Sequence, residues 1–138
     1  VFCEEWHEPL ISGIRWVSEL FEVLGADDVC VETRTEQGAK GRIFTPEEVA
    51  RRNPELVVAS WCGRKAKREK IIARPGWSEV TAVREDQLYE IRSPVILQPG
   101  PALFTDGAAQ VARIIRAAAL GEKLPPVRAG ELRSALGA

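Results

Sequence analysis

The chain has 138 residues, of which 45% are hydrophobic and 28% are charged, and its formal net charge at pH 7 is −1. These values are ordinary for one globular domain, and the balanced charge gives no support for general attraction to nucleic acid or anionic lipid. No apolar stretch approaches the roughly 20 residues that a membrane-spanning helix needs.

A strand is predicted at the start of the chain, over residues 1–5, and it ends in Trp6 and His7. Apolar residues at helical spacing over 12–24 predict a helix. Residues 28–32 predict a second strand, which a polar loop follows. Because the chain opens inside a strand and contains no methionine, we expect it to be a piece of a longer protein.

The next helix has a strong start signal. Thr45 can cap it, Pro46 suits the first helical position, and Glu48 completes a capping box. The helix is predicted to end before Pro54, because the residue that precedes a proline is pushed out of helical geometry. A third strand, at 56–60, follows directly as a run of branched apolar residues.

The second half of the chain alternates between helical and extended patterns. Residues 64–74 predict a short helix, and residues 80–91 predict an edge hairpin. Three prolines and one glycine within 93–101 predict a loop that is held open. A long amphipathic helix is predicted from Phe104 to Gly121, and the pattern beyond it is weak.

This alternation of strands and helices predicts an α/β fold, a Rossmann-like three-layer lobe with a mostly parallel sheet covered by helices. Strands 1–5, 28–32 and 56–60 are expected to be parallel neighbours. We expect residues 1–120 to form the ligand-binding lobe and residues 121–138 to form a tail. No phosphate-binding glycine pattern follows the first strand, so nucleotide binding is unsupported.

Two tryptophans follow strands of the predicted sheet. Trp61 comes directly after the strand at 56–60, within Ser60-Trp61-Cys62-Gly63-Arg64, and Trp6 follows the first strand. In open α/β sheets, ligands bind at the carboxyl ends of the strands. We therefore expect Trp6, Trp61 and Arg64 to line one concave surface with loop 93–101. For the two tryptophans, ligand contact and simple packing remain equally open.

Other chemistries at these strand ends have less support. Cys62 could act as a nucleophile with His7 as its base, but no orienting third group is recognisable. Arg64 and Lys65 follow where a dithiol motif would need a second cysteine. His7 and Cys62 are also too few for a metal site, and a solvated loop histidine is the simpler interpretation. Cys3 and Cys30 lie in apolar runs and are expected to be buried.

A dense run of basic residues occupies 64–74. Nucleic-acid contacts would require a uniformly basic surface, whereas carboxylates balance the rest of this chain. A solvated helix face is the interpretation for most of these residues. Arg64 is the exception, because it lies nearest to the strand end.

Several motifs together resemble the carboxyl-terminal lobe of the substrate-binding proteins that feed cobalamin and iron-chelate ABC importers. The resemblance covers residues 1 to about 120. The motifs that carry it are Glu4-Glu5-Trp6, Pro9-Leu10-Ile11-Ser12-Gly13, Arg15-Trp16-Val17-Ser18-Glu19-Leu20, Thr45-Pro46-Glu47-Glu48-Val49, Asn53-Pro54-Glu55-Leu56-Val57-Val58, Ser60-Trp61-Cys62-Gly63, Ala73-Arg74-Pro75-Gly76-Trp77, Leu88-Tyr89-Glu90-Ile91 and Gln98-Pro99-Gly100-Pro101.

The resemblance implies a two-lobed protein with the ligand between its lobes, of which this chain is the second lobe. It implies a binding protein and not an enzyme, without cofactor or resident metal, periplasmic or extracytoplasmic, and held at the membrane through the transporter or a lipid anchor. The implied ligand is cobalamin or a related corrinoid, with a ferric siderophore or haem as the alternative. The residues implied to contact it are Trp6, His7, Trp61, Cys62, Arg64 and Gln98.

The implied partner is the membrane permease, onto which family members dock through one acidic residue on each lobe. The residue at the matching place is Glu47. On the residues alone, Glu47 is simply a carboxylate that the dipole of its helix favours. The resemblance adds the docking role.

Overall fold

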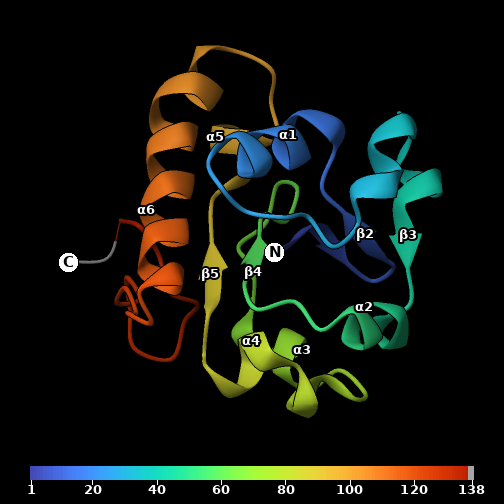
Figure 1. Ribbon diagram of the computed structural model, residues 1–138, viewed down its shortest axis with the longest axis vertical. Coiled ribbons are helices and arrows are strands. Elements are labelled where there is room, and N and C mark those ends of the chain that lie inside the picture. The colour runs from blue at the N-terminus through green and yellow to red at the C-terminus, as the bar shows by residue number, and fades with distance from the viewer. Residues whose placement is uncertain (137–138) are drawn as a thin grey trace.

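The computed structural model describes residues 1–136, and a mixed five-stranded sheet lies at its centre (Figure 1). The strand order is β3-β2-β1-β4-β5. Strands β1, β4 and β5 are parallel neighbours, whereas β2 is antiparallel to both β1 and β3, so only β2 runs in the opposite direction. The bounds are Phe2–His7 for β1, Leu10–Ser12 for β2, Ile43–Phe44 for β3, Val57–Ala59 for β4 and Leu88–Glu90 for β5. The predicted α/β class with a mostly parallel sheet is confirmed.

Helices cover both faces of the sheet. Phe2, Val57 and Leu88 point to one face, where they pack in a core with residues of α2, α3 and α4. The next residue of each strand points to the other face, toward α1, α5 and α6. The α-helices are α1 (Arg15–Val23), α2 (Pro46–Arg52), α3 (Arg68–Ile72), α4 (Thr81–Arg84), α5 (Ser93–Ile96) and α6 (Ala108–Ala119). Short 3₁₀ turns are η1 (Val31–Thr35), η2 (Ala39–Arg42) and η3 (Trp77–Glu79), and η4 (Leu103–Gly107) is a π-helical turn before α6.

Helix α2 begins as the sequence predicted. The side chain of Thr45 accepts a hydrogen bond from the backbone N–H of Glu48, and the Glu48 carboxylate accepts one from the backbone N–H of Thr45. This reciprocal pair satisfies two donors that the first helical turn leaves unpaired. Asn53 ends the helix in the left-handed conformation.

The predicted strand at 28–32 is wrong. This segment is a turn that continues into η1, and β1 is flanked instead by β2 and β4. The Asp28 carboxylate holds this turn: it accepts hydrogen bonds from the hydroxyl of Ser18 in α1 and from the backbone N–H of Cys30, two residues further along the chain. Such local bonds give the backbone an alternative to a sheet ladder.

The predicted edge hairpin at 80–91 is also wrong. Residues 81–84 form α4, and only Leu88–Glu90 is a strand, which runs parallel to β4. The backbone N–H of Thr81 donates to the side-chain oxygen of Asn53, which satisfies a donor at the start of α4. The chain reverses instead at Asp86, whose φ is 51°.

Three further elements differ in extent from the prediction. The helix expected over 64–74 is confined to α3, because residues 64–67 form a loop around the end of β4. Within 93–101, residues 93–96 form α5, since Pro94 stands in the first turn, where a helix tolerates proline. Phe104 is 77% exposed and lies in η4, so it does not belong to the buried face of α6.

The chain returns to the sheet after α6. Arg133 lies alongside β5, where its backbone carbonyl accepts from Glu90 and its backbone N–H donates to Leu88. Its guanidinium also bonds to the carboxylate of Asp86. Leu132 is buried in the core on the α2 side of the sheet. Residues up to 135 therefore contribute to the fold of the lobe.

Candidate ligand-binding site

The carboxyl ends of β1 and β4 lie side by side, which brings their following residues together. Glu4 pairs with Ala59 in the parallel register, and the backbone N–H groups of Ser60 and Cys62 donate to the carbonyls of Glu4 and Glu5. The pairing of β1 with β2 is irregular between Glu4 and Trp6. Such irregularities redirect side chains near binding sites, because the extra residue bends the strand.

Three aromatic rings meet at this edge, and we call Trp6, His7 and Trp61 the aromatic cluster. The His7 ring stacks on Trp61 with 4.2 Å between ring centroids and 19° between ring planes. Trp6 lies at 5.2 Å from His7 and 6.3 Å from Trp61, tilted against both. Trp6 and His7 are half-buried, whereas Trp61 is only 2% exposed. The structure thus joins these three rings, with Trp61 beneath the other two.

Arg64 lies at the rim of the aromatic cluster. Its side chain is exposed, and its guanidinium carbon lies 5.7 Å from the centroid of the Trp6 ring. The left-handed φ of +71° at Gly63 turns the chain there. The backbone N–H of Gly63 donates to the Ser93 hydroxyl at 3.1 Å, which ties this turn to the start of segment 93–101. A cation, flat rings and an anchored turn are therefore adjacent.

The pKa of His7 lies below its ordinary value. Partial burial is the largest cause, because it disfavours the charged imidazolium. The positive charges of Arg74, Lys70 and Arg64 act in the same direction, and only Glu8 opposes them appreciably. Burial and these charges therefore both favour the neutral form of the His7 ring.

Beneath the aromatic cluster, Arg74 forms a buried ion pair with Glu4. One guanidinium nitrogen of Arg74 lies 2.6 Å from a Glu4 oxygen, and the guanidinium carbon lies 4.5 Å from the centroid of the Trp77 ring. The side chains of Arg74 and Glu4 are 6% and 0% exposed. The solvated-face interpretation is therefore wrong for Arg74, and the signal that could have indicated this is the carboxylate of Glu4 in the middle of an apolar strand.

Other predicted site residues stand apart from this arrangement. Cys62 is exposed, and within residues 1–136 no hydrogen bond joins it to His7. Gln98 is exposed beyond α5, and none of the hydrogen bonds of the described chain links it to the aromatic cluster. Glu47 is exposed in the first turn of α2 and makes no ion pair with any described residue. Cys3 and Cys30 are buried, as predicted.

The described residues contain no group of three or more His, Cys, Asp or Glu side chains that could hold a metal ion. His7 and Cys62 thus have no third candidate ligand in the part of the chain that the structure describes. Nor does any described helix have the length and apolar character needed to cross a membrane.

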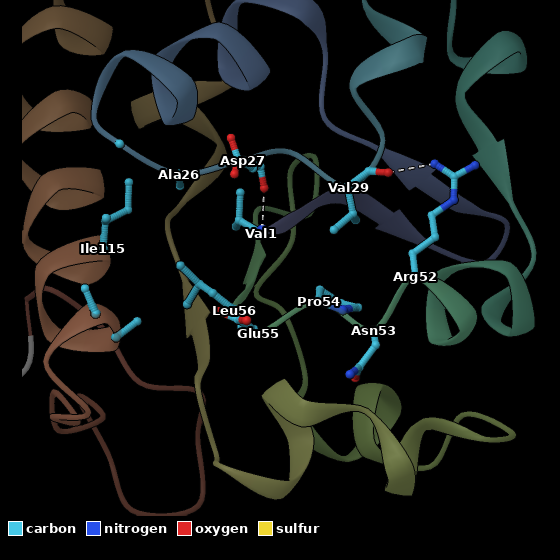
Figure 2. Close-up of a pocket in the computed structure, with 13 residues that line it drawn as sticks. Val1, Ala26, Asp27, Val29, Arg52, Asn53, Pro54, Glu55, Leu56 and Ile115 are labelled. Atoms are coloured by element: carbon cyan, nitrogen blue, oxygen red, sulfur yellow. Dashed lines mark hydrogen bonds between the residues drawn. The ribbon is translucent and has the colours of Figure 1, made fainter.

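A cavity of about 430 Å³ lies at the opposite end of the sheet (Figure 2). It is bordered by Val1 and Leu56, which precede β1 and β4, and by Ile115 of α6. The ammonium group of Val1 donates to the carbonyl of Asp27 at its edge. A second hollow, of about 530 Å³, lies between α6, Val95 and Leu136. The aromatic cluster lines neither of these two cavities.

The structure is thus an α/β lobe with the aromatic cluster at the carboxyl ends of its parallel strands β1 and β4. The periplasmic binding protein family matches residues 3–95 of the 138, about two-thirds of the chain. The chain therefore belongs to this family, whose members are binding proteins and not enzymes. A comparison with curated proteins found no match.

Among solved structures, the lobe is similar to the periplasmic vitamin B12 binding protein BtuF of Vibrio cholerae. The TM-score is 0.66 at 21% sequence identity, over 86% of this chain and 44% of that protein. The chain thus spans less than half the length of the protein that it resembles. At this identity the likeness establishes the fold, namely one lobe of a periplasmic binding protein.

Proposed function

We propose that this chain is one ligand-binding lobe of the substrate-binding component of an ABC importer, and that its ligand is cobalamin or a related corrinoid. The observation that carries the proposal is the aromatic cluster at the adjoining ends of β1 and β4, with Arg64 at its rim. A corrin is large, flat and mostly apolar, with polar groups at its edge. Aromatic side chains can bury its face while a guanidinium meets its rim.

The open form of the site agrees with binding between two lobes. Neither of the two cavities described above includes the aromatic cluster, and a ligand at its exposed rim would need a second surface to be enclosed. We propose that a second lobe of the same protein supplies this surface. The protein would act outside the cytoplasm, at the membrane through its transporter or a lipid anchor.

A ferric siderophore or haem is the second candidate ligand. The observation in its favour is the presence of two exposed cations, Arg64 and Lys70, whose charges reach His7. A haem carries propionates and many ferric chelates carry net negative charge, which these cations would attract. A corrin ring with amide groups gains less from them.

Visible absorption spectra test the two candidates directly. The chain is mixed separately with cyanocobalamin, haemin and a ferric catecholate, and the bound fraction is read after gel filtration. Co-elution of cyanocobalamin supports the corrinoid, whereas co-elution of haemin or the ferric chelate alone selects the second candidate. If none co-elutes with a protein that carries both lobes, the proposed site does not bind flat chelates.

Substitution of Trp61 gives the first quantitative prediction. Trp61→Ala should weaken cyanocobalamin binding by about 1–3 kcal/mol, the usual loss for an aromatic anchor. Because Trp61 is buried, Trp61→Phe is the matched variant that keeps a ring and should bind more tightly than Trp61→Ala. Isothermal titration measures both, after circular dichroism has shown that each variant is folded. Unchanged affinity in Trp61→Ala would remove Trp61 from the site.

A further inference from the structure

The indole of Trp61 differs from the other three tryptophans in its hydrogen bonding. The Nε1–H groups of Trp6, Trp16 and Trp77 each donate to a backbone carbonyl, those of Glu8, Ile96 and Pro46. Nε1 of Trp61 is buried and has no partner among the described residues. A buried donor without an acceptor is unfavourable, because it has lost its bond to water and gained none in return.

The ring that covers Trp61 belongs to His7. The two rings are nearly parallel, with 4.2 Å between their centroids, which is the arrangement that a flat ligand would adopt on an indole. Trp61 is 2% exposed in this arrangement. A ligand can therefore reach the indole of Trp61 only after the rings that cover it have moved.

We propose that His7 is a specificity-determining residue of the candidate site. Its ring occupies the place on Trp61 that a flat ligand takes, so a ligand binds there only if it displaces this stack. The unpaired Nε1–H lies in the plane of the indole, so a ligand that satisfies it must carry an oxygen acceptor that reaches past the stacked rings to the edge of Trp61. The proposal rests on the proposed function for the ligand's flat shape.

The position of His7 in the chain fits a ring that can be displaced. His7 is the last residue of β1, and β1 pairs irregularly with β2 just before it. It is half-buried, and its ring makes no hydrogen bond with any described side chain or backbone group. The ring stacks against Trp6 and Trp61, and a rotation of the side chain alone leaves the backbone pairing of His7 with Leu10 in place.

Hydrogen exchange at the indole N–H groups tests, without any ligand, whether the His7 ring shields Trp61 from solvent. In ¹H–¹⁵N spectra of this 15.2 kDa chain, the Trp61 signal is assigned by its loss in Trp61→Phe. His7→Ala should exchange this Nε1–H with solvent at least about tenfold faster, because local exposure controls exchange. His7→Phe keeps a stacking ring and should exchange slowly, and Glu8→Ala is the neighbouring control. Equal exchange rates in the parent and His7→Ala would overturn the proposal.

Titration with cyanocobalamin and with haemin tests the competition. If His7 competes with the ligand, His7→Ala should bind whichever of the two probes the parent binds, with a dissociation constant about two- to twelvefold lower. This factor corresponds to the free energy of one aromatic pair. Weaker binding by His7→Ala would show that His7 is a ligand contact and would overturn the proposal. Cyanocobalamin carries amide oxygens at the edge of its ring, and haemin carries carboxylates. The probe that binds more tightly therefore indicates which kind of oxygen accepts the hydrogen bond from Trp61.

The two measurements separate failure of this inference from failure of the proposed function. If neither probe binds to any variant, the proposed function fails, and the exchange rates still decide whether His7 covers Trp61. The Trp77 indole, which donates to Pro46, reports in the same spectrum whether each variant is folded. An unfolded His7→Ala leaves the decision to His7→Gly and His7→Phe, compared in the same way.

Discussion

Arg74 and Glu4 place two charges beneath the aromatic cluster, in the interior of the lobe. Burial raises the pKa of Glu4, while the charge of Arg74 and its hydrogen bonds oppose this effect. Removing both charges from water is costly, and their mutual attraction offsets this only while both are present. The stability of the lobe around β1 therefore depends on the presence of both Arg74 and Glu4.

Arg74→Met should destabilise the lobe by about 3–5 kcal/mol, because it leaves the buried Glu4 carboxylate unpaired. Urea denaturation followed by circular dichroism measures the change. Arg15→Ala is the matched control, since the Arg15–Glu19 pair is exposed to solvent and its loss should change the stability little. The double variant Glu4→Leu/Arg74→Met should recover most of the loss. A single variant as stable as the parent would show that the ion pair does not support the fold.

His7 should titrate with a pKa below 6.5, because burial and the nearby cations disfavour its protonated form. The native state then binds the proton less readily than the unfolded state. Stability linked to His7 is full above pH 6.5 and falls as the pH drops through 6.5 toward the lower native value. His7 is the only histidine, so one imidazole signal in NMR spectra gives its midpoint. A midpoint at or above 6.5 contradicts this.

Side-chain neighbours were predictable from the sequence where strand topology decides them. Trp6 and Trp61 follow parallel strands, whose carboxyl ends meet at one edge, so their proximity could be predicted. The cover of His7 over Trp61 could not be, because it depends on an irregularity in the pairing of β1 with β2. The burial of Arg74 could not be predicted either, because its basic neighbours in sequence are mostly exposed.

At the scale of elements, the capping box of α2 gives a sharp comparison within one helical turn. Thr45→Ala should destabilise the lobe by about 0.5–2 kcal/mol, because it leaves the N–H of Glu48 without its acceptor. Glu47→Ala, two residues away, should change stability by less than about 0.5 kcal/mol, since Glu47 is exposed. Thermal and urea denaturation measure both. Equal losses in the two variants would show that the cap contributes nothing of its own.

Elements with strong local signals were predicted well, and those decided by side-chain hydrogen bonds were not. The boundary signals at Thr45 and Pro54 fixed α2 because they act within one turn of the backbone. Residues 28–32 have the composition of a strand, yet the Asp28 carboxylate bonds to Cys30 and to Ser18 of α1 and holds a turn. At 80–91, the acceptor supplied by Asn53 comes from a distant helix end, which periodicity alone does not reveal.

At the scale of the whole molecule, the three-layer architecture followed from the order of the elements, because right-handed crossovers between parallel strands place helices on both faces. The antiparallel β2 and β3 did not, since Leu10–Ser12 and Ile43–Phe44 are too short for a recognisable pattern. They lie beside α2 at one edge of the lobe, whereas α6 covers the other edge (Figure 1).

The docking role that the family resemblance implies for Glu47 can be tested directly in transport. Glu47→Ala should slow ligand uptake by the reconstituted importer while ligand affinity stays unchanged, because the lost carboxylate would pair with arginines of the permease. Glu122→Ala is the matched control: it removes another exposed carboxylate, after α6, and should leave uptake unchanged. Normal uptake by Glu47→Ala would show that Glu47 has no docking role and is simply a residue in the first turn of α2.

The return of the chain along β5 has a consequence for self-association. A strand at the edge of a sheet exposes unpaired N–H and C=O groups that can recruit another chain. Here Arg133 occupies backbone groups of Leu88 and Glu90, and the opposite edge strand, β3, is only two residues long. Within residues 1–136, the sheet thus offers little template for intermolecular strand addition. The lobe can present an open aromatic surface to a ligand while its sheet edges resist aggregation.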